Sequence, residues 1–259
     1  MLNFLYLTGD LHGQLGQLEN FKPTRPFETG IVLLGDSGAN YYLNKRDAYF
    51  KNQLNDLGYK IYIIRGNHDA RPEDLPNIMQ VYDSDLRGIV YWEEEYPNIR
   101  YLLDGGIYTF KDKKILTIGG AYSIDKFYRL AMCWRWFDNE QLSEEERNKI
   151  LSEIKGQSFD FILTHTCPTI FQPTDLFLTS IDQTMVDNSM EVWLNSVLRD
   201  TNWKYWCFGH YHEDRIISPQ VFMLMHNIID IEMIDTYSTE LALPEHMRVG
   251  PQFFNYERE

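Results

Sequence analysis

Residues 60–69 read Lys-Ile-Tyr-Ile-Ile-Arg-Gly-Asn-His-Asp, and this stretch decides the fold. Its first half, Lys60–Ile64, is rich in β-branched and aromatic residues and predicts a short buried strand. The glycine that follows permits a tight turn, and an amide, an imidazole and a carboxylate come directly after it. The sequence therefore predicts a strand whose carboxyl end carries chemically active side chains.

The same arrangement recurs along the chain. Four more apolar runs predict strands, at Asn3–Thr8, Ile31–Leu34, Phe159–Leu163 and Tyr205–Phe208. Each run is followed by a polar motif: Gly9-Asp10-Leu11-His12-Gly13, Gly35-Asp36, Thr164-His165 and Gly209-His210-Tyr211-His212. Because loops at strand ends converge on one edge of a layered α/β fold, we expect these side chains to meet in space.

The remaining elements complete an α/β pattern. Helical character is predicted at Tyr42–Leu57, which Gly58 ends, and at Glu140–Ile154 and Glu191–Leu198. Further strands are predicted at Ile107–Phe110, Ile115–Ile118, Arg215–Ile217, Val221–Met225 and Ile228–Met233. The sequence has no internal repeat and no low-complexity linker, so we predict a single domain over residues 1–259.

Composition narrows the classes of function. The chain has 259 residues, 44% of them hydrophobic, and a formal charge of −14, which disfavours bulk nucleic-acid binding through a basic face. Its three cysteines have no disulfide or zinc spacing. With no signal peptide or membrane span evident, the expectation is a cytoplasmic protein without a membrane partner. The oligomeric state is left open.

The polar motifs supply enough ligands for two divalent metal ions. We predict a first site from Asp10, His12, Asp36 and His212, and a second site from Asp36, Asn67, His165 and His210. The Asp36 carboxylate is expected to bridge the two ions through its two oxygens. Mixed nitrogen and oxygen ligands suit Mn, Fe or Zn, and the sequence does not choose among them.

A dinuclear site of this composition is suited to hydrolysis of phosphate esters. The two ions hold an attacking hydroxide and neutralise the phosphoryl oxygens, so even an acidic protein attracts phosphate there. His68 directly follows a ligand without being needed as one. We therefore predict that His68 is the general acid that protonates the leaving group and that Asp69 orients it.

These motifs resemble those of the calcineurin-like metallophosphoesterase superfamily, whose pattern is GDxHG, GD, GNH(E/D), a lone histidine and GHxH. The resemblance covers residues 8–212. It implies a two-sheet β-sandwich flanked by helices, with the site at one edge, and the same ligand and acid roles. One departure concerns Ala39 and Asn40, where the phosphoprotein phosphatase subgroup has Asp and Arg. This disfavours a Ser/Thr-type protein phosphatase.

The substrate contacts are less constrained. Arg65, Lys126 and Arg129 are the candidates for binding phosphate, and residues 119–137 are predicted to form a substrate-facing loop whose aromatic rings stack on a base. The competing interpretation, which we favour for Trp134 and Trp136, buries both rings against the core. The predicted activity is hydrolysis of a small phosphomonoester or phosphodiester, with nucleotides among the candidates. A catalytically silent scaffold of the same fold is the alternative.

Overall fold

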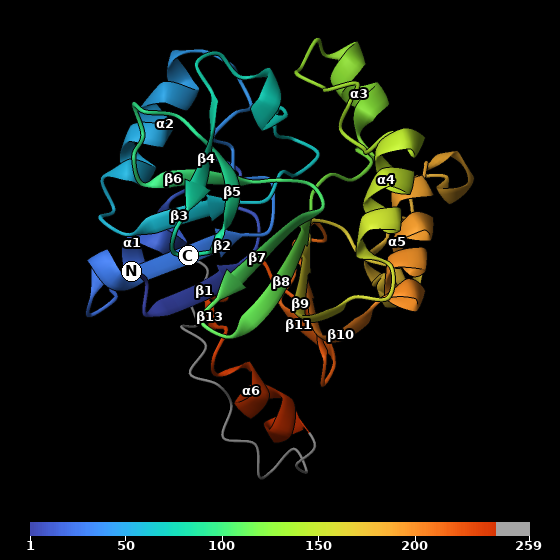
Figure 1. The fold of residues 1–259 in the computed structure, drawn as a ribbon. Helices are drawn as coiled ribbons and strands as arrows, with labels where there is room; N and C mark the ends of the chain where they lie inside the picture. The colour runs from blue at the N-terminus through green and yellow to red at the C-terminus, as the bar shows by residue number, and fades with distance from the viewer. Residues whose placement is uncertain (242–259) are drawn as a thin grey trace.

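The computed structural model describes residues 1–241, with side chains to residue 237. The predicted single domain covers residues 1–259, so its last part, residues 242–259, lies outside the described residues. The described chain forms two facing sheets (Figure 1). The first sheet has the order β13 (Ile229–Asp230), β1 (Phe4–Thr8), β2 (Thr29–Leu33), β3 (Lys60–Ile63), β6 (Ile99–Leu102), β5 (Gly88–Trp92), β4 (Met79–Asp83). The second has the order β11 (Arg215–Ser218), β12 (Val221–Met223), β10 (Asn202–Phe208), β9 (Ser158–Thr164), β8 (Lys113–Ile118), β7 (Gly106–Phe110).

Helices flank the two sheets, as Figure 1 shows. They are α1 (Gly16–Asn20), α2 (Lys45–Asn55), α3 (Lys126–Ala131), α4 (Glu144–Ile154), α5 (Ser189–Asp200) and α6 (Ile234–Leu241). Helices α1 and α2 lie on the side of the first sheet, and α4 and α5 pack side by side on the second. The predicted two-sheet sandwich flanked by helices is confirmed.

Alternating side chains explain the layers. In β1, Leu5 and Leu7 enter the core between the sheets, while Tyr6 packs on the other face with the α1 and α2 side. In β10, Cys207 belongs to the core between the sheets and Trp206 to the core under α4 and α5. Strands buried on both faces need apolar residues at almost every position, which is why these strands read as continuous apolar runs.

Several predicted boundaries were wrong, and caps explain the helical ones. Helix α2 begins at Lys45 because the Asn44 side chain accepts a hydrogen bond from the backbone of Arg46. Helix α4 begins at Glu144 because Ser143 forms a capping box with Glu146. The last predicted strand shrinks to two residues, β13.

The sequence did not indicate the strands β4, β5 and β6 or the helices α1, α3 and α6. Strands β4 and β5 lie at the sheet edge with largely exposed or half-buried side chains, so no continuous apolar run marks them. Helix α3 falls inside the segment predicted to be a loop, and it stands beside α4 at the top of Figure 1. No helix in residues 1–241 combines the length and apolar character that crossing a bilayer requires.

Candidate metal centre

Parallel strands bring the predicted ligands together. The strands β1, β2 and β3 pair in parallel in one sheet, and β8, β9 and β10 do so in the other, so their carboxyl ends meet at one edge of the sandwich. Backbone hydrogen bonds tie the ligand loops to each other. The amide of His12 donates to the carbonyl of Asp36 at 2.8 Å, and the amide of Gly209 donates to the carbonyl of His165 at 3.0 Å.

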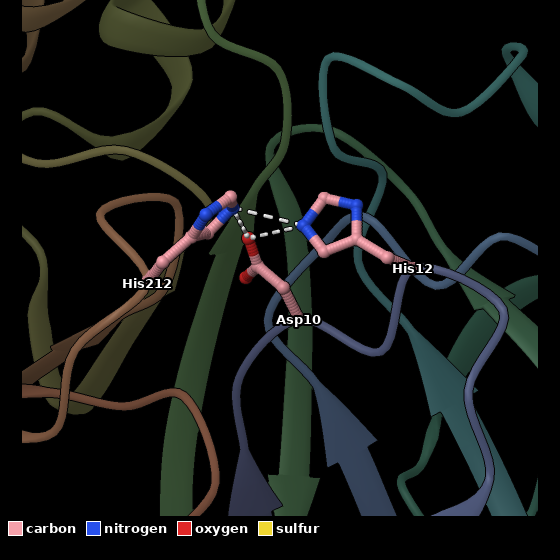
Figure 2. Close-up of side chains that lie close together, drawn as sticks. All are labelled: Asp10, His12 and His212. Atoms are coloured by element: carbon pink, nitrogen blue, oxygen red, sulfur yellow. Dashed lines mark hydrogen bonds and ion pairs between the residues drawn. The ribbon is translucent and has the colours of Figure 1, made fainter.

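The first predicted site forms a tight cluster. The Nε2 atoms of His12 and His212 lie 2.9 Å apart. They lie 3.7 and 3.5 Å from Oδ2 of Asp10, and Figure 2 shows both rings directed at this oxygen. Within the described residues, this buried oxygen accepts no hydrogen bond. A buried carboxylate oxygen without a donor is suited to a cation, and one held with the two imidazole nitrogens would satisfy it. Asp10 also raises the pKa of the neighbouring His212.

The second predicted site contains two acceptors that face each other. Nδ1 of His165 lies 2.7 Å from the carbonyl oxygen of Leu34, so Nδ1 carries a proton and donates it. A ring that carries this one proton keeps a lone pair on Nε2, and Nε2 lies 2.8 Å from Oδ1 of Asn67. Nε2 also lies 3.7 Å from Oδ1 of Asp36. A cation bound between Nε2 of His165, Oδ1 of Asn67 and Oδ1 of Asp36 would accept a lone pair from each of these three atoms.

The orientation of the Asn67 amide follows from its other contact. Its Nδ2 donates to Oγ of Ser123 at 2.9 Å, and that hydroxyl donates to the Glu140 carboxylate at 2.5 Å. A carboxylate at this position accepts only, so the hydroxyl must accept from the amide nitrogen of Asn67. The amide oxygen of Asn67 is thereby held toward His165. Ser123 and Glu140 were not predicted as site residues, because neither lies in a motif.

His210 completes the second set. Its ring centroid lies 4.9 Å from that of His165. Burial, and then the neighbouring His165, holds the pKa of His210 well below its usual value, so the ring is neutral and keeps a lone pair for a metal. For Asp36, burial works to raise the pKa, but His68, His165 and His12 together hold it below its usual value. The carboxylate that is predicted to bridge the two ions is therefore ionised.

Backbone geometry at the site is unusual in two ways. His12, Asp36, His210 and His212 all have positive φ, between 40° and 71°, which costs energy for residues other than glycine and is concentrated at functional sites. A methyl group on Gly66 would lie 2.0 Å from Oδ1 of Asp36. The glycine before Asn67 is thus required by the close approach of the neighbouring ligand loop.

Asp69 does not contact the ring of His68, contrary to its predicted role. Its buried carboxylate accepts hydrogen bonds from the backbone amides of Ser37, Gly38 and Gly66, at 3.1, 3.3 and 3.0 Å. Burial, followed by repulsion from Asp36, raises the pKa of Asp69 to about 6. Asp69 therefore joins the two loops that carry Asp36 and Asn67 and acts on the backbone.

His68 instead contacts side chains from α3 and its N-cap. Nδ1 of His68 lies 3.4 Å from Oδ2 of Asp36 and 3.3 Å from Nη2 of Arg129, and Nε2 lies 3.9 Å from Oδ1 of Asp125. Arg129 is fixed by Asp125 at 2.7 Å and by the hydroxyl of Tyr41 at 2.8 Å. The sequence identified Arg129 but gave no signal for Asp125 or Tyr41, since both contacts depend on where α3 lies.

The other two predicted substrate cations are engaged elsewhere. The Arg65 side chain is 1% exposed and pairs with Asp104 at 3.1 Å, while its Nη1 donates to the carbonyl of Glu140. Nζ of Lys126 lies 4.2 Å from the centre of the Trp136 ring, a cation–π contact. Neither lines the pocket beside the metal ligands. The predicted phosphate contacts of Arg65 and Lys126 are therefore replaced by structural ones.

A pocket of about 830 Å³ opens beside His12, Asp36 and His68. Its other walls carry three arginines and four aromatic rings: Arg46, Arg129, Arg135, Tyr41, Tyr42, Trp134 and Trp136. Trp134 is 51% exposed, so the expectation that it buries against the core was wrong. Trp136 is half-buried and donates to Glu140 at 2.9 Å.

A comparison with protein families identifies the family and supports the fold. The model of the family described as calcineurin-like phosphoesterase matches residues 5–214, a range that includes all seven predicted ligands. The chain belongs to the calcineurin-like phosphoesterase family. Among curated protein sequences, none matches it.

Two solved structures resemble this calcineurin-like phosphoesterase at low identity. The phosphopantetheinyl hydrolase PptH from Mycobacterium tuberculosis shares 14% identity with a TM-score of 0.45, covering 86% of this chain and 88% of that chain. A second structure shares 12% identity with a TM-score of 0.48, covering 90% and 96%.

This member of the family departs from the phosphoprotein phosphatase pattern at the second motif, and the structure shows what the replacing residues do. Ala39 is fully buried in the core beneath α2, and Oδ1 of Asn40 accepts a hydrogen bond from Lys51 at 3.2 Å. The charged side chains beside the ring of His68 are Asp36, Asp125 and Arg129.

Proposed function

We propose that this chain is a phosphoesterase that uses two divalent metal ions to hydrolyse a small phosphorylated substrate. The observation that carries the proposal is the pair of facing acceptors, Nε2 of His165 and Oδ1 of Asn67, at 2.8 Å. The donorless oxygen of Asp10 supports it from the other half of the site. The residues that would hold the ions are Asp10, His12, Asp36, Asn67, His165, His210 and His212.

When bound, such ions activate water for in-line attack on phosphorus and neutralise the phosphoryl oxygens. His68 supplies the proton for the leaving group. Because the guanidinium of Arg129 is a donor only, it donates to Nδ1 of a neutral ring whose single proton is on Nε2 beside Asp125. Loss of that proton would leave an imidazolate, so the ring has to take up a second proton before it acts as the acid, and burial opposes this by lowering the pKa of His68. Arg129 is held rigidly by Asp125 and Tyr41, so its charge is already in place when the phosphate arrives.

The two alternatives have less support. A catalytically silent scaffold has no need of an acid, yet His68 lies beside Asp36 with a cation and a carboxylate around its ring. A Ser/Thr-type protein phosphatase is disfavoured because Ala39 and Asn40 are engaged in the core and with Lys51.

The finer points of the proposal concern the metal, the partner and the location. Manganese, iron and zinc all suit the ligands, and manganese is the ion we would test first. The partner is a small phosphorylated molecule, with nucleotides among the candidates. We also place the protein in the cytoplasm, where a free and exposed thiol such as that of Cys133 stays reduced.

The test compares p-nitrophenyl phosphate with bis-p-nitrophenyl phosphate, using protein stripped of metal and reloaded with Mn²⁺. We expect turnover that depends on the metal, and a loss of about 10²–10⁴-fold in His68→Asn. His226→Asn is the matched control, since His226 is exposed and contacts Gln17 rather than the site. Preference for the monoester identifies a phosphatase, and preference for the diester a phosphodiesterase. Absence of metal-dependent turnover of both esters would contradict the proposal.

A further inference from the structure

Two arginines of the pocket form no ion pair with a described carboxylate. No carboxylate oxygen in the described residues lies within 4.0 Å of the guanidinium of Arg46 or Arg135. Arg46 stacks on the ring of Tyr42 at 4.9 Å, and Nη2 of Arg135 donates to the backbone carbonyl of Tyr42 at 3.1 Å. In a chain with 38 acidic and 24 basic residues, two arginines that contact the same tyrosine and form no ion pair mark a surface that attracts anions, although the charge of Arg135 also acts on Asp47.

The reacting phosphate does not account for these charges. Arg129 already contacts His68, and among the described residues that line the pocket Asp36 is the one carboxylate. The pocket therefore carries more positive charge than a single phosphate bound at the predicted metal ligands would contact. Guanidinium groups pair strongly with phosphate oxygens through two parallel hydrogen bonds.

Exposed aromatic rings share this pocket. Trp134 is 51% exposed and Tyr42 is 41% exposed. Each ring is held at its edge by another ring, Tyr128 against Trp134 at 5.5 Å and Tyr41 against Tyr42 at 4.7 Å. Large rings that are fixed in orientation and still open to solvent are suited to stacking on a planar ligand.

We infer that this pocket selects a nucleotide with at least two phosphate groups, in which the second phosphate binds Arg46 and Arg135 and the base stacks on Trp134 or Tyr42. The pocket volume of about 830 Å³ lies in the range of sites for ligands of this size and exceeds what phosphate alone fills. The inference rests on the proposed function, because it names the substrate of the same site.

Three probes separate the two parts of the pocket. ADP has a base and two phosphates, AMP has a base and one phosphate, and pyrophosphate has two phosphates and no base. With the Mn²⁺-loaded protein we expect kcat/KM for ADP to exceed that for AMP by about tenfold to a hundredfold, the worth of one charge-assisted hydrogen-bonded contact.

Variants assign each part to its residues. The double variant Arg46→Ala/Arg135→Ala should bring the ADP and AMP values within about twofold of each other, and leave hydrolysis of p-nitrophenyl phosphate within about twofold of the wild type. Trp134→Ala should lower kcat/KM for ADP and leave pyrophosphate unchanged. Arg25→Ala and Phe27→Ala are the matched controls, because both side chains are exposed and neither lines the pocket.

The outcomes distinguish this inference from the proposed function. If p-nitrophenyl phosphate is hydrolysed while ADP and AMP react equally well in the wild type, the inference is overturned and the proposed function stands. If nothing is hydrolysed, the proposed function fails, and calorimetric titration with ADP and AMP decides the inference. Tighter binding of ADP that is lost in the double arginine variant supports it, and equal or absent binding overturns it.

Discussion

Removal of one hydroxyl group outside the motifs should weaken the metal centre. Oγ of Ser123 accepts from Asn67 at 2.9 Å and donates to Glu140 at 2.5 Å, and Ser123 is 2% exposed. In Ser123→Ala the amide of Asn67 loses the partner that fixes its orientation, and the buried carboxylate loses one donor. The amide oxygen is then free to turn away from His165.

The size of the effect follows from burial. Leaving a buried polar group without its partner costs about 1–3 kcal/mol, and for a chain of this length about 2 kcal/mol corresponds to a fall in Tm of about 4–8 °C. Loss of a residue that orients a metal ligand lowers metal affinity by about 10- to 100-fold. We expect both effects in Ser123→Ala.

The assay is calorimetric titration of Mn²⁺ into stripped protein, together with thermal unfolding in the absence of metal. Ser152→Ala is the control, because the hydroxyl of Ser152 is exposed and donates to the backbone of Lys149 within α4. A Ser123→Ala protein with lowered Tm but unchanged Mn²⁺ affinity would refute the orienting role. Its hydroxyl would then be purely structural.

Three further predictions test other parts of the site. Gly66→Ala should destabilise the protein by about 1–3 kcal/mol and abolish Mn²⁺-dependent turnover, because the added methyl group would lie 2.0 Å from Oδ1 of Asp36. The control is Gly16→Ala, which has open space around the added methyl group and should change neither the unfolding free energy nor the activity. Arg129→Lys should lower kcat/KM for p-nitrophenyl phosphate by about 10²–10³-fold with unchanged Tm, and near-wild-type kinetics would contradict its role. Partial burial raises the pKa of Glu146, but hydrogen bonds from Arg71 and Ser143 lower it to about 2, from its ordinary value of 4.5 in an unfolded chain. Its stabilising effect is complete above the unfolded value and is lost as pH falls toward 2, so the Tm difference between wild type and Glu146→Gln should shrink between about pH 5 and pH 2, and a constant difference would contradict this assignment.

The sequence predicted the strands around the centre well, because there the local and the global signals agree. The strands that end at a predicted ligand are largely buried and read as apolar runs. The convergence of Asp10, Asp36, Asn67, His165 and His210 followed from the rule that parallel strands end at one edge.

The residues that surround the predicted ligands could not be predicted from the sequence, for a physical reason. Asp125, Arg129 and Tyr41 meet around His68 only because helix α3 brings Arg129 within hydrogen-bonding distance of Tyr41, a tertiary contact without a periodic signal. Ser123 and Glu140 act through Asn67 across 56 and 17 residues of sequence separation. Arg65 looked like a substrate cation because it precedes the motif, yet its side chain turns toward Asp104.

The measurement that tests the account most directly is a titration of stripped protein with Mn²⁺, in which bound metal and hydrolysis of p-nitrophenyl phosphate are followed together. The account predicts that activity is absent without metal and saturates when two ions are bound per chain, and that Asp36→Asn abolishes the second binding event. Full activity in stripped protein, or a chain that binds no Mn²⁺, would contradict it.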